Sequence, residues 1–309
     1  MDDRDAVGEA MRENGMPLWG AAPFDALRSF LLPCRAARRL PEGARSVLVA
    51  AFPYSCAREG GARISRYAAG ADYHLVAMER LRAAARELAR RFSSCRFEPF
   101  CDSSPVPEVR AARLAGLGCV GENGLLITPE YGSYVFLGEL VTDLPLPGGE
   151  RGGACLRCGA CAARCPSGAL TPEGVDVSRC VSALTQKKGA LSPQEEELLR
   201  RAGSLWGCDI CQECCPMNRG VRETEIAAFR ENRIADFTEE ELARADFETA
   251  YAGRAFLWRG AQVLRRNLRI LRREGAHTIT AGRAGPSAPE NAAEKTQSGA
   301  ARAERSGVP

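Results

Sequence analysis

Apolar and polar positions follow one another along the first half of the chain in a way that predicts strands and helices in turn. The apolar run at 45–54 predicts a buried strand, and apolar residues that recur every three or four positions between 73 and 92 predict an amphipathic helix. The stretch "RFEPFCD" predicts a second strand that ends at Asp102, and "EVRAARLAG" at 108–116 predicts a short helix closed by its glycine. Together these elements predict strands and helices that follow one another through the first part of the chain.

The second half of the chain carries two further patterns. The stretch "GLLITPEYGSYVFLGELVTDLPL" has two strand-like runs around "PEYG", which predicts a hairpin, and the prolines and glycines that follow it predict a linker. Residues 222–275 read as helical, whereas small and polar residues from Ala276 onward predict disorder. We therefore expect a first domain at 1–150, a cysteine-rich domain at 151–220, a helical segment at 221–275 packed on the core, and a disordered tail at 276–309.

Composition narrows the class of protein. The chain has 309 residues, of which 45% are hydrophobic and 26% charged, so it can bury a substantial core. No apolar run approaches the ~20 residues that span a bilayer, and the polar N-terminus is unlike a signal peptide, so we expect a cytoplasmic protein with no membrane contact. The net charge of +3 points to no dominant polyanionic partner, and 14 cysteines in a reducing compartment indicate metal rather than disulfides.

Four of the cysteines follow the spacing of bacterial ferredoxins. Cys155, Cys158, Cys161 and Cys165, the last followed by proline, match C-x2-C-x2-C-x3-C-P, in which three thiolates bind one 4Fe-4S cluster and the fourth binds a neighbouring cluster. A zinc site is the alternative, but zinc normally takes paired C-x2-C units rather than a triple run. The spacing therefore predicts iron–sulfur chemistry and further ligands downstream.

Those further ligands are present. Cys208, Cys211 and Cys215 repeat the end of a ferredoxin run, and Cys180 stands alone before them. The exchange of the fourth cysteine assigns Cys155, Cys158, Cys161 and Cys215 to one cluster and Cys165, Cys180, Cys208 and Cys211 to the other. Cys214 lacks both the spacing and the following proline, so we expect it to be no ligand; Cys34, Cys56, Cys95, Cys101 and Cys119 read as small buried residues. About 150 residues precede this electron-transfer segment, which argues for an attached catalytic or cofactor domain.

The chain resembles a known family, the epoxyqueuosine reductases, which are cobalamin-dependent iron–sulfur enzymes of tRNA queuosine synthesis. The matching stretches are "SRYAAGADYH", Asp102 with the "SSPVPE" that follows it, "AGLGCVGENGLLITPEYGSYVFLGELVTDLPL", "RCVSALTQKKG" and "WGCDICQECCP". The resemblance implies an α+β fold, in which a cobalamin-binding α/β domain related to that of reductive dehalogenases carries a ferredoxin-like double 4Fe-4S segment. It implies a reaction that reduces the epoxide of epoxyqueuosine in tRNA to an alkene with two electrons and loss of water.

The resemblance also implies roles for single residues. Asp102 matches the family's proposed proton donor, which would require burial or a neighbouring carboxylate such as Glu108 to raise its pKa; a turn carboxylate is the alternative. Leu126 and Leu137 match contacts to the corrin, although both also read as core residues. Ser182 matches a position near the cobalamin, and Lys188 a position near the tRNA, with an ordinary solvated lysine as the alternative.

Cofactor ligation and partners complete the expectations. "DYHLVA" lacks the glycine of the D-x-H-x-x-G cobalt-binding signature, so we expect base-off cobalamin without a histidine ligand and read His74 as a pocket or structural residue. Full-length relatives end in HEAT-like repeats, whereas this sequence has only "FLWRGAQVLRRNLRIL" before its tail and reads as a short form. The arginines of that segment could contact phosphate or form the solvated face of a packed helix. We expect a monomer that takes electrons from a reduced ferredoxin or flavodoxin-type donor.

Two other functions stay open from the sequence alone. One is a cobalamin-dependent reductase of a different small molecule, which the shortened C-terminus would suit. The other is an iron–sulfur electron-transfer protein that serves a corrinoid partner and has no corrin pocket of its own.

Overall fold

A four-stranded antiparallel sheet forms the centre of the computed structural model, which describes residues 2–57, 60–150 and 152–272. The strand order is β1-β2-β6-β3. Strands β2 and β6 pair along their full lengths, from Ser46 opposite Thr142 to Pro53 opposite Val135, and nearly every residue of both is buried. The strands are β1 (Trp19–Pro23), β2 (Ser46–Pro53), β3 (Phe97–Phe100) and β6 (Val135–Thr142).

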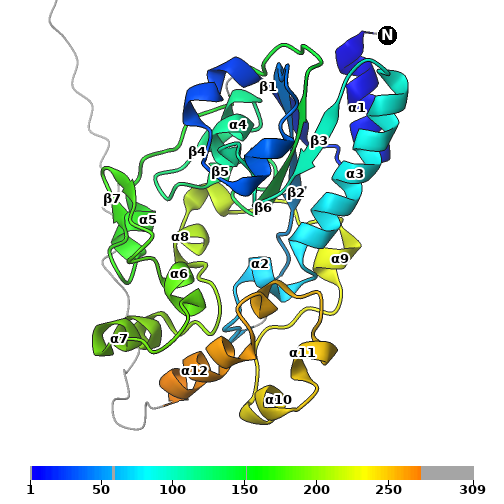
Figure 1. The fold of residues 1–309 in the computed structure, drawn as a ribbon. Helices are drawn as coiled ribbons and strands as arrows, with labels where there is room; N and C mark the ends of the chain where they lie inside the picture. Colours follow the sequence, from blue (N-terminus) through cyan, green and yellow to red (C-terminus); the bar gives the residue numbers. More distant parts are fainter. Residues whose placement is uncertain (1, 58–59, 151, 273–309) are drawn as a thin grey trace, which may run out of the picture. The chain divides into compact units, whose positions relative to one another are not determined.

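Helices cover both faces of this sheet (Figure 1). On one face, α1 (Asp3–Glu13) and α3 (Tyr73–Arg91) bury Met11, Leu81 and Leu88 against β2 and β6. On the other face lie α4 (Glu108–Leu114) and three short 3-10 turns, η1 (Phe24–Ala26), η2 (Arg28–Phe30) and η3 (Arg35–Arg39). The predictions of a strand at 45–54, a helix at 73–92, a strand before Asp102 and a helix at 108–116 are confirmed.

The predicted hairpin around "PEYG" is wrong in its pairing. The turn exists, because Thr128 and Gly132 exchange backbone hydrogen bonds of 2.8 and 3.1 Å. The two strands then separate: β5 (Leu126–Ile127) pairs with β4 (Cys119–Val120), whereas β6 pairs with β2 and β3. An apolar strand buried on both faces needs a partner on each side, and the two-residue β5 is too short to provide one.

The cysteine-rich segment consists of short elements joined by tight turns. They are α5 (Ala160–Arg164), β7 (Leu170–Thr171), β8 (Gly174–Val175), α6 (Val181–Gln186), α7 (Pro193–Ala202), α8 (Ile210–Glu213) and η4 (Pro216–Asn218). The segment is tied to the first half by the buried Trp206, which bridges to Ile64, and by Asp209, which accepts a hydrogen bond from the Ser65 hydroxyl next to α2 (Arg66–Ala69). Because residues 2–272 pack as one compact unit, the boundaries expected at 150 and 220 stay predictions.

The helical expectation for 222–275 is only partly confirmed. One helix of three turns, α12 (Ala261–Arg272), follows three single turns of α-helix and one 3-10 turn: α9 (Ala227–Arg230), α10 (Glu239–Ala243), α11 (Phe247–Ala250) and η5 (Ala255–Leu257). The apolar residues between these turns pack as an aromatic cluster, with Phe237 in edge contact with Phe247 and Phe256. The disordered tail expected from Ala276 lies outside the described residues.

No helix in the described part of the chain combines the length and the apolar character needed to cross a membrane.

The close approach of β1 to the end of α4 generates a packing prediction. A Cβ atom on Gly20 would lie 2.2 Å from the Ala115 carbonyl oxygen, which is backbone and cannot turn aside. We expect Gly20→Ala to cost about 2 kcal/mol and to lower the apparent melting temperature of the anaerobically prepared protein by roughly 5 °C. Gly43→Ala is the matched control, because its nearest neighbour is Asp143 Cβ at 3.9 Å. Equal melting temperatures for the two variants would contradict the packing.

Candidate functional site

Asp102 lies on a strained turn directly after β3. Its φ of +58° is in the left-handed region, which costs a residue other than glycine free energy and which aspartate tolerates better than most. The amide of Ser103 donates to the Cys101 carbonyl, and that of Ser104 to the Asp102 carbonyl, both at 2.7 Å. The turn leaves the carboxylate about half exposed, with 56% of the side chain accessible. A strained, accessible carboxylate marks this turn as a candidate site.

His74 links Asp102 to the first turn of α3. Asp72 caps that helix by accepting a hydrogen bond from the His74 amide, and the His74 ring then lies between two carboxylates. Its Nδ1 is 2.7 Å from Asp72 Oδ1, and its Nε2 is 3.3 Å from Asp102 Oδ2. The Tyr73 hydroxyl donates to the other Asp102 oxygen at 3.3 Å. Both ring nitrogens of His74 are therefore engaged by acidic side chains.

This arrangement sets the charges of the pair. Burial lowers the pKa of His74, but the hydrogen bonds to Asp102 and Asp72 outweigh it and raise the pKa to about 9. The hydrogen bond from His74 in turn lowers the pKa of Asp102 below its ordinary value, despite partial burial. The expectation that a neighbouring carboxylate raises the pKa of Asp102 is therefore wrong: at neutral pH the proton is on His74, and Asp102 is ionised.

Two glutamates next to Asp102 show the opposite behaviour. Burial, and then the Asp102 charge, raises the pKa of Glu108 to about 7. Glu139, in the middle of β6, is fully buried, and burial followed by the Glu108 charge raises its pKa well above the ordinary value. The group that responds to Asp102 is thus Glu108. The sequence predicted a pocket or structural role for His74 and did not single out Glu139, whose only signal was a charged residue inside an apolar strand.

A cavity of about 600 Å³ opens beside Asp102 and Glu108. Its wall is apolar at Leu32, Val106 and Val120, while two carboxyl groups and the guanidinium groups of Arg110 and Arg113 supply its polar side. A concave apolar surface with a few converging polar groups is typical of a small-molecule site.

The other residues expected at the cofactor lie elsewhere. Leu126 on β5 and Leu137 on β6 share the apolar core between the sheet and α4 and are 3% and 6% exposed. Ser182 on α6 lines a second cavity of about 600 Å³, together with Cys180, Lys188 and Trp258. The structure brings the two leucines together and groups Ser182 with Lys188, but it does not bring either set to the cavity at Asp102. Their contacts with a corrin stay predictions.

One group of cysteines gathers around α8. Burial, followed by the neighbouring thiols of Cys208 and Cys180, raises the pKa of Cys211 to about 12. Burial likewise raises the pKa of Cys208 to about 11, with Cys180 and Cys165 among its neighbours. The backbone amide of Ala169 donates to Cys165 Sγ at 3.4 Å. Cys165, Cys180, Cys208 and Cys211 are thus neighbours, and an electropositive metal cluster would ionise thiols such as those of Cys208 and Cys211, whose pKa burial raises.

A second group gathers around α5. Cys214 has Cys215 and Cys158 among the neighbours that raise its pKa, after burial itself, and Cys161 has Cys214 among its own. Cys155 accepts a hydrogen bond from the Arg157 amide at 3.5 Å. The Cys214 thiol donates to the carbonyl oxygen of Ala160 at 3.5 Å, so it has a partner inside the protein.

Among residues 2–57, 60–150 and 152–272, no three side chains of the metal-binding types converge on a point for a single ion. Cluster ligation does not require such convergence, because four thiolates surround an inorganic cube rather than one ion.

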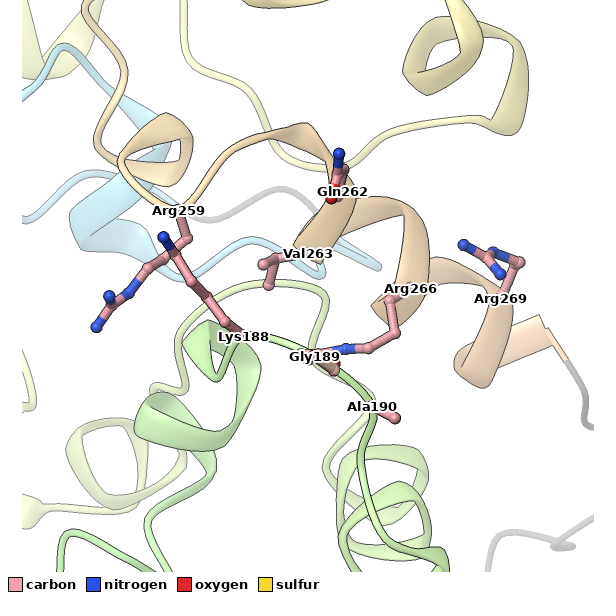
Figure 2. A pocket seen from close by; sticks show the side chains of 8 residues that line it. All are labelled: Lys188, Gly189, Ala190, Arg259, Gln262, Val263, Arg266 and Arg269. Carbon is pink, nitrogen blue, oxygen red and sulfur yellow. The ribbon is translucent and has the colours of Figure 1, made fainter.

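A basic pocket of about 420 Å³ lies between the loop after α6 and the start of α12 (Figure 2). Lys188 contributes from the loop, and Arg259, Arg266 and Arg269 from the other side. The Arg266 guanidinium donates to the carbonyl oxygen of Gly189 at 2.7 Å and also to that of Lys187, so it anchors the helix as well as lining the pocket. Leu264 and Leu268 are buried beneath the basic face, so the segment is a packed amphipathic helix, and whether its arginines contact phosphate or only solvent stays a prediction.

Two family profiles match the chain. Residues 35–103 match one described as Epoxyqueuosine reductase QueG, DUF1730, and residues 154–218 match a 4Fe-4S double cluster binding domain. The predictions of an iron–sulfur segment and of the family are confirmed by these matches.

Several curated relatives are epoxyqueuosine reductases. The protein of Gloeobacter violaceus is 39% identical over 241 residues, which cover 74% of this chain and 76% of the relative. The protein of Vibrio cholerae is 38% identical, over 68% of this chain and 58% of its own length, and that of Escherichia coli is 42% identical, over 50% and 41%. The match thus spans about three quarters of the first relative and about half of the other two.

Solved structures support the same fold. The epoxyqueuosine reductase from Streptococcus thermophilus matches with a TM-score of 0.73 at 25% identity, covering 88% of this chain and 81% of that one. An epoxyqueuosine reductase solved with an epoxyqueuosine-modified tRNA-Tyr stem loop matches with a TM-score of 0.75 at 26% identity, covering 87% and 80%. The expected α+β fold is therefore confirmed, and this chain belongs to the epoxyqueuosine reductase family.

Proposed function

We propose that this chain is an oxidoreductase that reduces epoxyqueuosine to queuosine in tRNA, with electrons passed through two 4Fe-4S clusters to a cobalamin. The observation that carries the proposal is the match to the Gloeobacter relative over three quarters of its length. A tRNA substrate places the reaction in the cytoplasm. We expect a monomer that accepts electrons from a reduced ferredoxin or flavodoxin-type protein.

The residues of the chain suit both cofactors. We assign Cys155, Cys158, Cys161 and Cys215 to one cluster and Cys165, Cys180, Cys208 and Cys211 to the other; the hydrogen bond of Cys214 to Ala160 supports leaving it out. Both ring nitrogens of His74 face carboxylates, which supports base-off cobalamin without a histidine ligand. Leu126, Leu137 and Ser182 are the proposed contacts to the corrin. When bound, the clusters and the corrin supply the two electrons and the low-valent cobalt for the reduction.

The chain's own residues supply the protons. Reduction of an epoxide to an alkene breaks two C–O bonds, consumes two electrons and two protons, and releases one water. Asp102 is ionised at rest and faces the cavity, so it can orient the His74 imidazolium and accept a proton from it. The imidazolium holds the first proton. Asp102 can pass that proton to the departing oxygen once His74 has given it up. Asp102 is therefore the proposed catalytic group, with His74 as its proton source.

The basic pocket supports the tRNA part of the proposal. Lys188, Arg259 and Arg269 surround a space that a phosphate could enter, and the Arg259 guanidinium stacks 3.5 Å above the ring of Trp258, which is 58% exposed. Cationic side chains with an exposed aromatic ring are typical of nucleic-acid surfaces. Lys188 is the residue we propose for direct contact with the tRNA.

The cluster assignment leads to a first functional prediction. We expect Cys215→Ala to lose one cluster, about half of the roughly eight irons per chain, while Cys214→Ala keeps both. Iron and sulfide analysis after anaerobic reconstitution, with the visible absorption of the clusters, measures this. A Cys214→Ala protein that loses iron while Cys215→Ala keeps it would reverse the assignment.

The His74–Asp102 pair leads to a prediction on pH. The folded pKa of His74 is raised, so its stabilising contribution is present below about pH 6.5 and is lost as the pH rises through about 9. We expect Asp102→Asn to lower the pKa of His74 toward its ordinary value. Proton NMR follows the imidazole signals, with a His277→Ala variant to assign the other of the two histidines. An unchanged His74 titration in Asp102→Asn would contradict the pair.

Activity on tRNA tests the proposal as a whole. Epoxyqueuosine-containing tRNA is incubated anaerobically with the cobalamin-loaded protein and a chemical reductant, and queuosine is measured by mass spectrometry. We expect Asp102→Asn to lower kcat by roughly 10²- to 10⁴-fold. Lys188→Ala should raise KM severalfold with little change in kcat, and the effect should shrink at high salt.

The same assay separates the alternatives. If the wild-type protein binds cobalamin but leaves the tRNA unchanged where a known reductase converts it, the substrate is a different molecule. A protein that binds no cobalamin is an electron carrier.

A further inference from the structure

The proton chemistry above leaves one buried acidic residue without a role. Glu139 is 0% exposed in the middle of β6, opposite Val49 of β2 and Phe100 of β3. Neither of its carboxyl oxygens meets a cation or a well-formed hydrogen bond within the described part of the chain, and the Ser104 hydroxyl is the neighbour that favours its ionised form. An ionised carboxylate there would cost several kcal/mol, so a protonated Glu139 is the state that the fold permits.

Glu139 points to the face of the sheet that α4 covers, because its strand neighbours Leu137 and Val141 belong to the core on that face. Glu108 in the first turn of α4 comes close enough for its charge to act on Glu139, and Asp102 acts from the adjoining turn. Cys101, at the end of β3, is within the field of the same carboxyl groups, and the Ser104 hydroxyl offsets part of the burial effect.

Glu108 connects this interior group to the cavity. It lines the cavity beside Asp102 and is hydrogen-bonded to the Asp102 backbone. One of its two carboxyl oxygens is buried and has no partner in the described structure, while the residue as a whole is only partly buried. Glu108 therefore lines the cavity and is near enough to the enclosed Glu139 for its charge to act on that group.

We propose that Glu108 and Glu139 form a proton-sharing carboxyl pair that delivers the second of the two protons consumed in the reduction. The inference rests on the proposed function, in which the His74–Asp102 pair supplies only one proton. Glu108 gives its proton to the oxygen that leaves as water, Glu139 passes its proton to Glu108, and the pair is refilled from solvent through the cavity. Two adjacent buried carboxyl groups do not both ionise at neutral pH, so the pair keeps at least one proton in reserve.

Infrared spectroscopy of the full chain tests, independently of activity, whether the Glu108–Glu139 pair holds a proton. At neutral pH ordinary carboxyl groups are ionised, so a protonated buried carboxyl gives an isolated carbonyl band. We expect the wild-type protein to show such a band above pH 7, and Glu139→Gln to lack it. Val141→Ala, on the same strand and face, removes packing but no titrating group and should keep it. Absence of the band from the wild type would overturn the proposal.

A second measurement on the wild-type chain does not require a folded variant. A carboxyl group whose folded pKa is raised binds its proton more tightly in the folded than in the unfolded state, so the stability that it contributes falls as the pH rises above its unfolded value near 4.5. We expect the wild type to lose stability from that pH upward and Glu139→Gln to lose less. The same slope in both proteins would count against a stored proton.

Kinetics test the delivery step. Under the tRNA assay we expect Glu139→Gln to lower kcat about tenfold or more, to leave KM and iron content unchanged, and to move the alkaline fall of kcat to lower pH, because Glu108 then titrates alone. Val141→Ala should leave the pH profile in place, as a purely structural role would. Equal kcat and pH profile in Glu139→Gln and the wild type would overturn delivery. If the wild type shows the band but reduces no epoxyqueuosine, the substrate assignment fails while the proton store stands.

Discussion

The pairing of β2 with β6 is the constraint on which the rest of the molecule depends. Because β6 is buried on both faces, its register against β2 fixes Glu139 beside α4 and places the residues just before β6 against the cluster segment. There the Ser133 hydroxyl donates to Gln212 at 2.9 Å, and the Ser133 amide to the Asn218 side chain at 2.8 Å. One strand therefore positions both the acidic site and the segment that carries the cysteines.

The charges of the acidic site determine its chemistry but contribute little to the stability of the fold. The His74–Asp102 pair is 39% and 56% exposed, so it contributes about 1 kcal/mol or less. The left-handed backbone of Asp102 costs about as much or more. The pair therefore does not compensate for the strain. The turn is held by the Ser104 hydroxyl, which accepts a hydrogen bond from the Val106 amide at 3.0 Å. A turn that costs stability while presenting a carboxylate to a cavity fits a functional rather than a structural role.

The sequence predicted well whatever depends on local periodicity. Helix α3, strands β2 and β3 and both ferredoxin runs follow from spacings within 20 residues. The hairpin failed because the partners of β6 lie far away in sequence, and a turn signal says nothing of a strand's second neighbour. The prediction of a raised pKa for Asp102 failed for a similar reason. Glu108 is only six residues away in the sequence, whereas His74, which lowers the pKa, is brought in from α3 by the fold. Glu139 was missed because a single charged residue in an apolar strand does not show which groups the fold packs against it.

In the proposed reaction the acidic site at Asp102 supplies protons, and the cysteine segment transfers electrons. Electrons require thiols that a metal cluster can ionise, and the cysteines around α8 and α5, most of them partly buried, offer such thiols. Protons require groups that remain protonated near neutral pH, and the fold makes two kinds: an imidazole held charged by carboxylates, and carboxyl groups held neutral by burial. Opposite electrostatic causes thus lead to the same result, a proton held where Asp102 meets the cavity. A reduction that removes oxygen as water needs two such protons for every two electrons.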